Sequence, residues 1–255
     1  MSPVLRAHLD RSIGMRARLE NADGLAALSG ARKRPREVSM IRASCGVLEA
    51  AVQAFREEWR TTSSPELGAL AAERRARGMA AQDVRTLVSL NGGRRLAPYK
   101  GQFETMPGPL VGYIAIKLAG YWSDMLITEG RLDREPPEAV RCTDLALDLM
   151  LATARPGVPR SALHSVAISS LAPLPLHPNL GGSVGHGIGL SLHEGPEFRA
   201  DEFAVLDEGG VYALAVGVAD PAAGYALKSA IIRLRRQSAE VLARSPNTTA
   251  SRRVG

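Results

Sequence analysis

The sequence predicts an α+β domain in which helices pack on one side of a mainly antiparallel sheet. Hydrophobic residues make up 45% and charged residues 23% of the 255 residues, a balance that excludes a disordered or fibrous chain. Apolar residues recur at helical spacing in some segments and form short strand-like runs in others. These segments come in blocks of two helices, strands, two helices and strands, which favours α+β over a parallel α/β sheet.

Four helices follow from caps and periodicity. Pro35 suits a first helical turn. The apolar residues after it have helical spacing: Val38, Ile41, Leu48, Val52 and Phe55. The next helix begins at Ser63, which has capping-box spacing to Glu66, and ends near Gly78. Two later helices are expected at 137–155 and 161–170.

The strands are expected between these helices. Residues 84–90 read as a strand that ends at the turn Asn91-Gly-Gly93. Residues 110–116 and 120–124 read as a hairpin. Three further strands are expected at 188–193, 210–218 and 225–235.

Three parts are expected along the chain: an N-terminal arm or short helix at 1–30, a main domain at 31–240 and a flexible basic tail at 241–255. The net charge of +6 arises at the two ends, because residues 61–230 hold fifteen basic and eighteen acidic residues. With only 4% aromatic residues available to stack on bases, this charge predicts no specific nucleic-acid partner.

The cysteines and the apolar runs indicate the compartment. Cys45 and Cys142 are too few for a disulfide scaffold and lack metal-site spacing. The first ten residues lack the apolar core of a secretory signal, and no run reaches the ~18 apolar residues of a membrane span. We therefore expect a cytoplasmic protein with no membrane partner.

One segment carries chemistry: Gly185-His186-Gly-Ile-Gly-Leu-Ser-Leu-His193-Glu194-Gly-Pro196. Two histidines seven residues apart do not alternate as one face of a regular strand, but they suit a bent strand that aims both side chains at one cleft. The structural alternative is that both histidines merely cap loops.

This string resembles the signature of the pita-bread family of methionine aminopeptidases, prolidases and creatinases, which is Gly-His-Gly-Ile-Gly followed by His-Glu-x-Pro. Other pieces follow in the family's order. They are Lys33-Arg-Pro-Arg-Glu-Val-Ser-Met-Ile-Arg42, Gly120-Tyr-Trp-Ser-Asp124 and Gly209-Gly-Val-Tyr-Ala-Leu-Ala-Val216. The resemblance covers roughly residues 30–235 and implies a pita-bread fold, with helices on a curved, mainly antiparallel sheet.

The family's metal site is where the sequence departs from the pattern. Active members hold two divalent ions with two Asp, one His and two Glu, a set that generates a metal-bound hydroxide. The resemblance places the second Asp on Asp124 and the His on His186. It places the first Asp on Tyr113, one Glu on Val216 and the other on or beside Lys228. Because too few ligands remain, no metal and no other cofactor is expected.

The remaining residues could still move protons on a small molecule, as the resemblance to the metal-free creatinase implies. His193 is the expected general acid or base, because an imidazole near pKa 6.5 works in both directions at neutral pH. Asp124 would orient His186 or bind a substrate cation, and Tyr113 would donate to a developing oxyanion. Lys228 would lie against Asp124, so that an ammonium replaces the metal's charge.

Besides Lys228, three residues are expected to bind substrate. Tyr99 matches the family's upstream cleft histidine, Arg95 could bind a carboxylate, and Glu194 could replace a lost ligand. Each assignment has a structural alternative: core filling for Tyr113 and Val216, an exposed strand position for Lys228, a turn cap for Asp124, solvated arginines at 94–95 and a turn at 194–196.

The sequence therefore predicts a metal-independent enzyme that uses histidine proton transfer for C–N bond cleavage or rearrangement. Its Ala/Arg/Gly-rich composition suggests bacterial specialised biosynthesis. One alternative is an inactive pseudo-peptidase that binds peptides or proteins, and another is a metal-dependent aminopeptidase or prolidase. The expected partners are a small-molecule substrate and, from the resemblance, a second copy of the chain in a homodimer.

Overall fold

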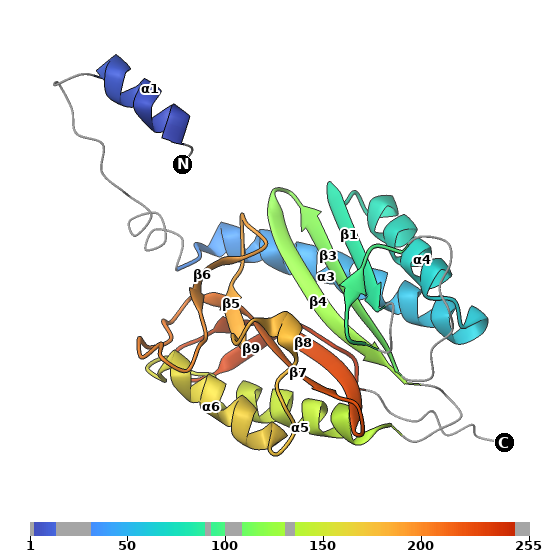
Figure 1. Cartoon of the computed structure of the whole chain (residues 1–255). Helices are drawn as coiled ribbons and strands as arrows, with labels where there is room; N and C mark the ends of the chain where they lie inside the picture. Colours follow the sequence, from blue (N-terminus) through green and yellow to red (C-terminus); the bar gives the residue numbers. More distant parts are fainter. Residues whose placement is uncertain (1–2, 14–31, 90–92, 100–108, 131–135, 248–255) are drawn as a thin grey trace. The chain divides into compact units, whose positions relative to one another are not determined.

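The computed structural model describes residues 3–13, 32–89, 93–99, 109–130 and 136–247. Its internal contacts divide the chain into two units, residues 1–30 and 31–255. The first unit contains the helix α1 (Pro3–Ile13). All other elements belong to the second unit (Figure 1).

The first half of the second unit consists of two helices followed by a four-stranded antiparallel sheet. The helices are α3 (Pro35–Thr62) and α4 (Pro65–Gly78). The strands are β1 (Asp83–Ser89), β2 (Leu96–Ala97), β3 (Leu110–Leu118) and β4 (Tyr121–Glu129). Their order is β2-β1-β3-β4, so β4 lies at the sheet edge. Ala119 and Gly120, both at positive φ, make the turn of the β3–β4 hairpin.

The second half repeats this plan. The helices are α5 (Glu138–Thr153) and α6 (Arg160–Leu171), followed by the short 3-10 helix η2 (Pro178–Leu180). The strands are β5 (Gly185–Gly187), β6 (Glu194–Glu197), β7 (Val211–Asp220), β8 (Gly224–Leu234) and β9 (Ala239–Arg244). They form a five-stranded antiparallel sheet in the order β6-β5-β7-β8-β9.

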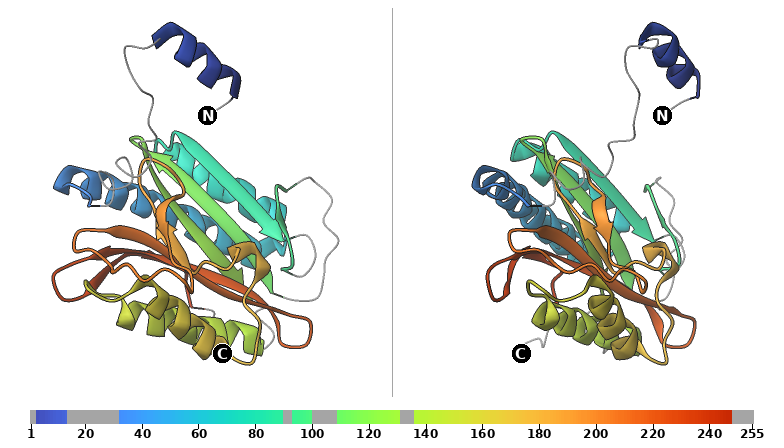
Figure 2. Two further views of the ribbon diagram at one scale, coloured as in Figure 1. Left: turned by 60° about the vertical axis from the view of Figure 1, so that its left-hand side comes forward. Right: turned by 90° about the vertical axis from the view of Figure 1, so that its left-hand side faces the viewer.

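The helices α3 and α4 pack against the first sheet, and α5 and α6 pack against the second (Figure 2). Apolar residues of α3, among them Ile41, Leu48 and Phe55, form one core with the first sheet and with part of the second. Apolar residues of α5 and α6, among them Leu147 and Leu163, form the other core against β7 and β8. The blocks of helices and strands expected from the sequence are therefore confirmed, as an α+β fold.

Three details differ from the expectation. Residues 188–193 form a loop, because the strand runs at 185–187 instead, where Gly187 lets β6 approach: a Cβ there would come 2.5 Å from the carbonyl oxygen of Gly195. The start of the tail expected at 241–255 is the end of β9, and Ser245 is buried. Ser64 rather than Ser63 caps α4, by accepting from Leu67 N.

Parts of the expected pattern lie outside the described residues. These are residues 14–30 of the N-terminal arm, the strand end and turn at 90–92, and residues 248–255 of the tail.

Of the helices in the described ranges, α3 alone is long and apolar enough to cross a membrane by length and composition. Half of its most apolar stretch is buried within the fold, as in the core helix of many globular proteins. Its length is therefore weak evidence for a membrane span.

The two cysteines should differ in reactivity. Cys45 on α3 is 1% exposed, and burial raises the pKa of its thiol to about 12, with the negative charges of Glu49 and Asp124 adding to the effect. Cys142 on α5 is only partly buried. Thiol titration should therefore show one fast-reacting cysteine in the native protein and two in denaturant, and Cys142→Ser should remove the fast phase. Equal rates for both thiols in the native protein would contradict the packing of α3.

Candidate functional site

A pocket of about 390 Å³ opens between the two sheets. Its lining comes from the inner faces of both sheets and from the segment around η2. The residues are Leu87, Leu96, Tyr113, Asp124, Leu126, Asn179, Leu180, Ser183, Gly185, His186, His193, Ala213, Ala215, Leu227 and Ser229. Four of the eight residues expected at the site therefore meet here: Tyr113, Asp124, His186 and His193.

Asp124 is the only carboxylic acid among these lining residues and is 9% exposed. The hydroxyl of Tyr113 on β3 donates a hydrogen bond to its Oδ2 at 3.1 Å, and its Oδ1 has no hydrogen-bond partner among the described residues. Burial raises the pKa of Asp124 to about 6, against the opposing effects of the Tyr113 hydrogen bond and of His193. Since the hydrogen of Tyr113 goes to Asp124, its expected role as an oxyanion donor is not supported.

His186 is held in one tautomer. Its Nδ1 lies 2.8 Å from the carbonyl oxygen of Gly187, which can only accept, so Nδ1 carries the hydrogen and Nε2 carries the lone pair. Burial lowers the pKa of this imidazole, which favours the neutral form. Asp124 makes no hydrogen bond to it, so the expected orienting role belongs to Gly187.

His193 stacks on His186, with ring centroids 4.1 Å apart and planes inclined by 25°. Its side chain is 56% exposed, and its Nε2 lies 3.1 Å from Oε1 of Glu197, which also pairs with Arg199. A neutral, partly buried imidazole and a solvent-exposed imidazole beside a carboxylate therefore share one wall of the pocket.

The alternation of side chains along β7 and β8 decides which residues face the pocket. Successive strand residues point to opposite faces, and Ala215 and Ser229 line the pocket. Their neighbours Val216 and Lys228 are fully buried on the other face. Val216, the position expected for one glutamate, therefore does not face the pocket. The other was expected on or beside Lys228, and of these positions the neighbouring Ser229 lines the pocket.

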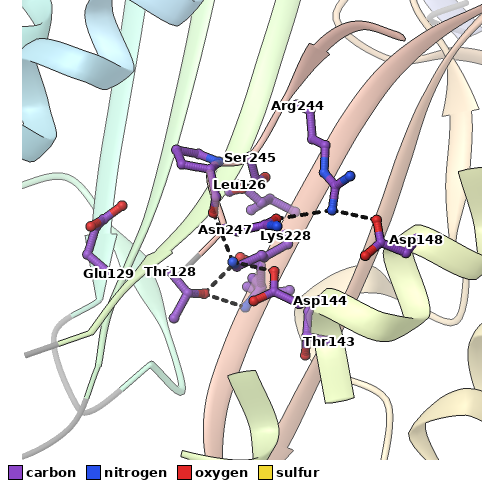
Figure 3. A network of polar contacts seen from close by, with 12 residues as sticks. Leu126, Thr128, Glu129, Thr143, Asp144, Asp148, Lys228, Arg244, Ser245 and Asn247 are labelled. Atoms are coloured by element: carbon purple, nitrogen blue, oxygen red, sulfur yellow. Dashed lines mark hydrogen bonds and ion pairs between the residues drawn. The ribbon is translucent and has the colours of Figure 1, made fainter. Parts of the chain in front are cut away.

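Lys228 lies in a separate network (Figure 3). Its Nζ contacts Oδ1 of Asp144 on α5 at 2.5 Å and donates to the carbonyl oxygen of Pro246 at 2.9 Å. Burial lowers the pKa of Lys228, although Asp144 opposes that shift. The expectations that Lys228 neutralises Asp124 or lies exposed on its strand are both wrong, because the side chain is buried on the opposite face of the sheet.

The other three expected substrate contacts do not line the pocket. The carboxylate of Glu194 pairs with Nζ of Lys33 at 2.7 Å and accepts from Ser191 N. Arg95 is exposed. Tyr99 lies at the edge of the first core, where burial and the nearby Glu73 raise its pKa.

Asn179 and Ser183, which line the pocket, and the fully buried His177 were not predicted from the sequence. His177 Nε2 lies 2.9 Å from the carbonyl oxygen of Gly93, and its Nδ1 accepts from Asn179 N. His177 therefore links the η2 segment to the loop before β2. A histidine beside the sequence Pro-Asn in a Pro/Gly-rich stretch was the available signal.

The pocket residues do not fit a two-ion centre that needs four carboxylates and an imidazole. The lining offers one carboxylate, from Asp124, and two stacked imidazoles. Tyr113, Ala215 and Ser229 face the pocket from the strands that would supply the other carboxylates. Within the described ranges, no group of three or more His, Cys, Asp or Glu side chains could hold an ion.

Asp124→Asn should increase stability in a pH-dependent way. Because the folded-state pKa is raised from 3.8 to about 6, ionising Asp124 costs the native state stability as the pH rises through this window. The variant should match the wild type below about pH 4 and exceed its free energy of unfolding above about pH 6, by up to about 3 kcal/mol. Urea denaturation across this range measures the difference, with the exposed Asp83→Asn as the matched control. A variant that is less stable than the wild type at pH 8 would contradict the unpartnered Oδ1.

Lys228→Met should destabilise the fold without changing the pocket face of β8. The substitution removes the buried cation from Asp144 and the donor from Pro246 O. We expect the free energy of unfolding to fall by about 1–3 kcal/mol, and a second change, Asp144→Leu, to restore part of it. Denaturant titration of the single and double variants tests this, and an unchanged midpoint for Lys228→Met would refute it.

Comparisons with known proteins agree on one family. The model of metallopeptidase family M24 matches residues 39–235. The X-Pro aminopeptidase of Thermotoga maritima is 22% identical, with a TM-score of 0.76 over 97% of this chain and 72% of that chain. The prolidase of Pyrococcus furiosus is 20% identical (TM-score 0.78; 96% and 74% covered). The methionine aminopeptidase of Thermotoga maritima is 16% identical (TM-score 0.64; 82% and 97% covered).

A search of curated protein sequences found no match. At these identities the solved structures establish the fold, which is the pita-bread fold, and the family model establishes the relationship. The chain belongs to metallopeptidase family M24.

Proposed function

We propose that the protein is a metal-independent enzyme that transfers protons through histidine to cleave or rearrange a C–N bond in a small molecule. One observation carries this proposal. The imidazole of His186, whose Nδ1 donates to the carbonyl oxygen of Gly187, stacks on that of His193 in a pocket whose lining includes one carboxylate, from Asp124.

The two histidines suit complementary roles. His186 cannot easily take a charge because it is partly buried, so its Nε2 is a base only while a substrate or a neighbouring group stabilises the imidazolium. His193 is exposed to solvent, from which it can regain a proton after each turnover, and its Nε2 lies 3.1 Å from the carboxylate of Glu197. We therefore assign His193 as the acid that donates to the leaving nitrogen and His186 as the base.

The proton balance of cleavage closes within this pair. The base removes a proton from water or from a carbon next to the C–N bond. The C–N electron pair leaves with the nitrogen, and the nitrogen receives the proton of the acid. The two imidazoles thus exchange protonation states once per turnover, and solvent at the exposed His193 restores them.

The proposal predicts that turnover depends on His193 and not on metal. Metal-stripped wild type, His193→Ala and the control His164→Ala, whose residue lies on α6 outside the pocket lining, would be incubated separately with small-molecule extract from the source organism. Mass spectrometry should show a compound consumed by the wild type and by His164→Ala. His193→Ala should slow this consumption by about 10²–10⁴-fold.

Two other outcomes would overturn the proposal. If no compound is consumed by a protein that still unfolds cooperatively, the chain is a binding module that has lost its chemistry. If consumption requires added manganese or cobalt, the protein is a metal-dependent peptidase, and its ligands must differ from those that line this pocket.

A further inference from the structure

We propose that the pocket recognises an organic cation, an ammonium or amidinium group carried on an apolar body, with Oδ1 of Asp124 as the acceptor. This inference rests on the proposed function in that it names the substrate class of the same pocket. It is argued from a buried oxygen in the lining that has no hydrogen-bond partner among the described residues.

The acceptor is fixed in place and unsatisfied. Tyr113 holds Oδ2 of Asp124, which fixes the plane of the carboxylate, and Oδ1 has no hydrogen-bond partner among the described residues. A buried carboxylate oxygen without a donor is costly, so a ligand that brings an N–H donor gains what the fold leaves unmade.

The described lining offers Asp124 no permanent positive charge. It contains neither lysine nor arginine. Lys228 is engaged by Asp144 on the opposite face of the sheet, and Lys33 is paired with Glu194. The two imidazoles of the lining are engaged elsewhere: Nδ1 of His186 donates to the carbonyl oxygen of Gly187, and Nε2 of His193 lies 3.1 Å from Oε1 of Glu197. A cationic ligand would therefore supply the missing countercharge.

The rest of the pocket suits an apolar body. Seven of the fifteen lining residues are leucines or alanines, and they come from both sheets and from η2. A bare divalent cation would find one carboxylate where calcium takes six to eight oxygen ligands, whereas an alkylammonium ion needs only a few acceptors and gains from the apolar walls. The chemistry of the lining thus favours an organic cation over a metal ion.

Binding should discriminate between a cation and its neutral isostere. Isothermal titration of the full chain near neutral pH would use three probes: 3-methylbutylamine, 3-methylbutanol and manganese chloride. The amine and the alcohol have the same branched alkyl body, so the difference between them reports the charged head alone. Asp124→Asn removes the acceptor's charge, and Asp83→Asn makes the same change at an exposed position on β1.

The amine should bind the wild type and Asp83→Asn at least about tenfold more tightly than the alcohol, and Asp124→Asn should remove this preference. Equal binding of the two probes, or no binding of either, would overturn the inference. Manganese that displaces the amine in an Asp124-dependent way would also overturn it, in favour of a metal site.

The result is separable from that of the turnover experiment. If a compound is consumed in a His193-dependent way but 3-methylbutylamine neither binds nor inhibits, the inference fails and the proposed function stands. If the amine binds through Asp124 and no compound is consumed, the cation site stands and the proposed function fails.

Discussion

The join between β4 and β8 is the constraint on which the pocket depends. Since β4 is the edge of its sheet, part of its backbone would lack partners, and β8 pairs with β9 only from Ala230 to Leu234, which leaves one side of its earlier residues open. Serine and threonine side chains satisfy these groups instead. Leu126 N donates to Ser229 Oγ at 2.8 Å, and Leu227 N donates to Thr128 Oγ1 at 2.9 Å. Ser245 Oγ contacts the carbonyl oxygen of Leu126 and accepts from Ser229 N, so the end of β9 closes the same join. The sheets are held by hydroxyl groups rather than by a continuous ladder.

This join gives β8 two buried faces with different chemistry. On one face, Leu227 and Ser229 contribute to an apolar pocket, while on the other Lys228 is neutralised by Asp144 on α5. An ammonium can be buried there because it has a carboxylate and a carbonyl oxygen within hydrogen-bond distance. The ammonium of Lys228 therefore binds α5, and it lies on the face of β8 opposite the pocket, away from Asp124. A shift of one residue in register would exchange these faces.

Periodicity and turn chemistry were enough to predict most of the fold, and the paired histidines were enough to locate the pocket. Helical spacing from Val38 to Phe55 and the hairpin expected from 110–116 and 120–124 are local signals, and the structure follows them. The register of β8 depends on contacts with distant parts of the sequence. Ser229 N donates to Ser245 Oγ, sixteen residues further on, and Lys228 contacts Asp144 on α5. For the same reason the partner of Glu194, which is Lys33 at a separation of 161 residues, could not be read from the motif that contains Glu194. Asn179 and Ser183 lie in a stretch without periodicity, so nothing in their spacing marked them.

The number of carboxylates in the pocket decides whether the folded protein needs a bound cation. A cluster of four buried carboxylates could not remain ionised without cations, because their mutual repulsion and desolvation would favour protonation. A single carboxylate can persist alone. Tyr113 donates to one oxygen of Asp124, and a pKa of about 6 leaves protonation within reach when the pocket is empty. Since β7 and β8 contribute Ala215 and Ser229 to the lining rather than further carboxylates, the folded state does not require a bound cation. An organic cation that enters and leaves is compatible with that balance, because Asp124 can take up a proton when the cation leaves.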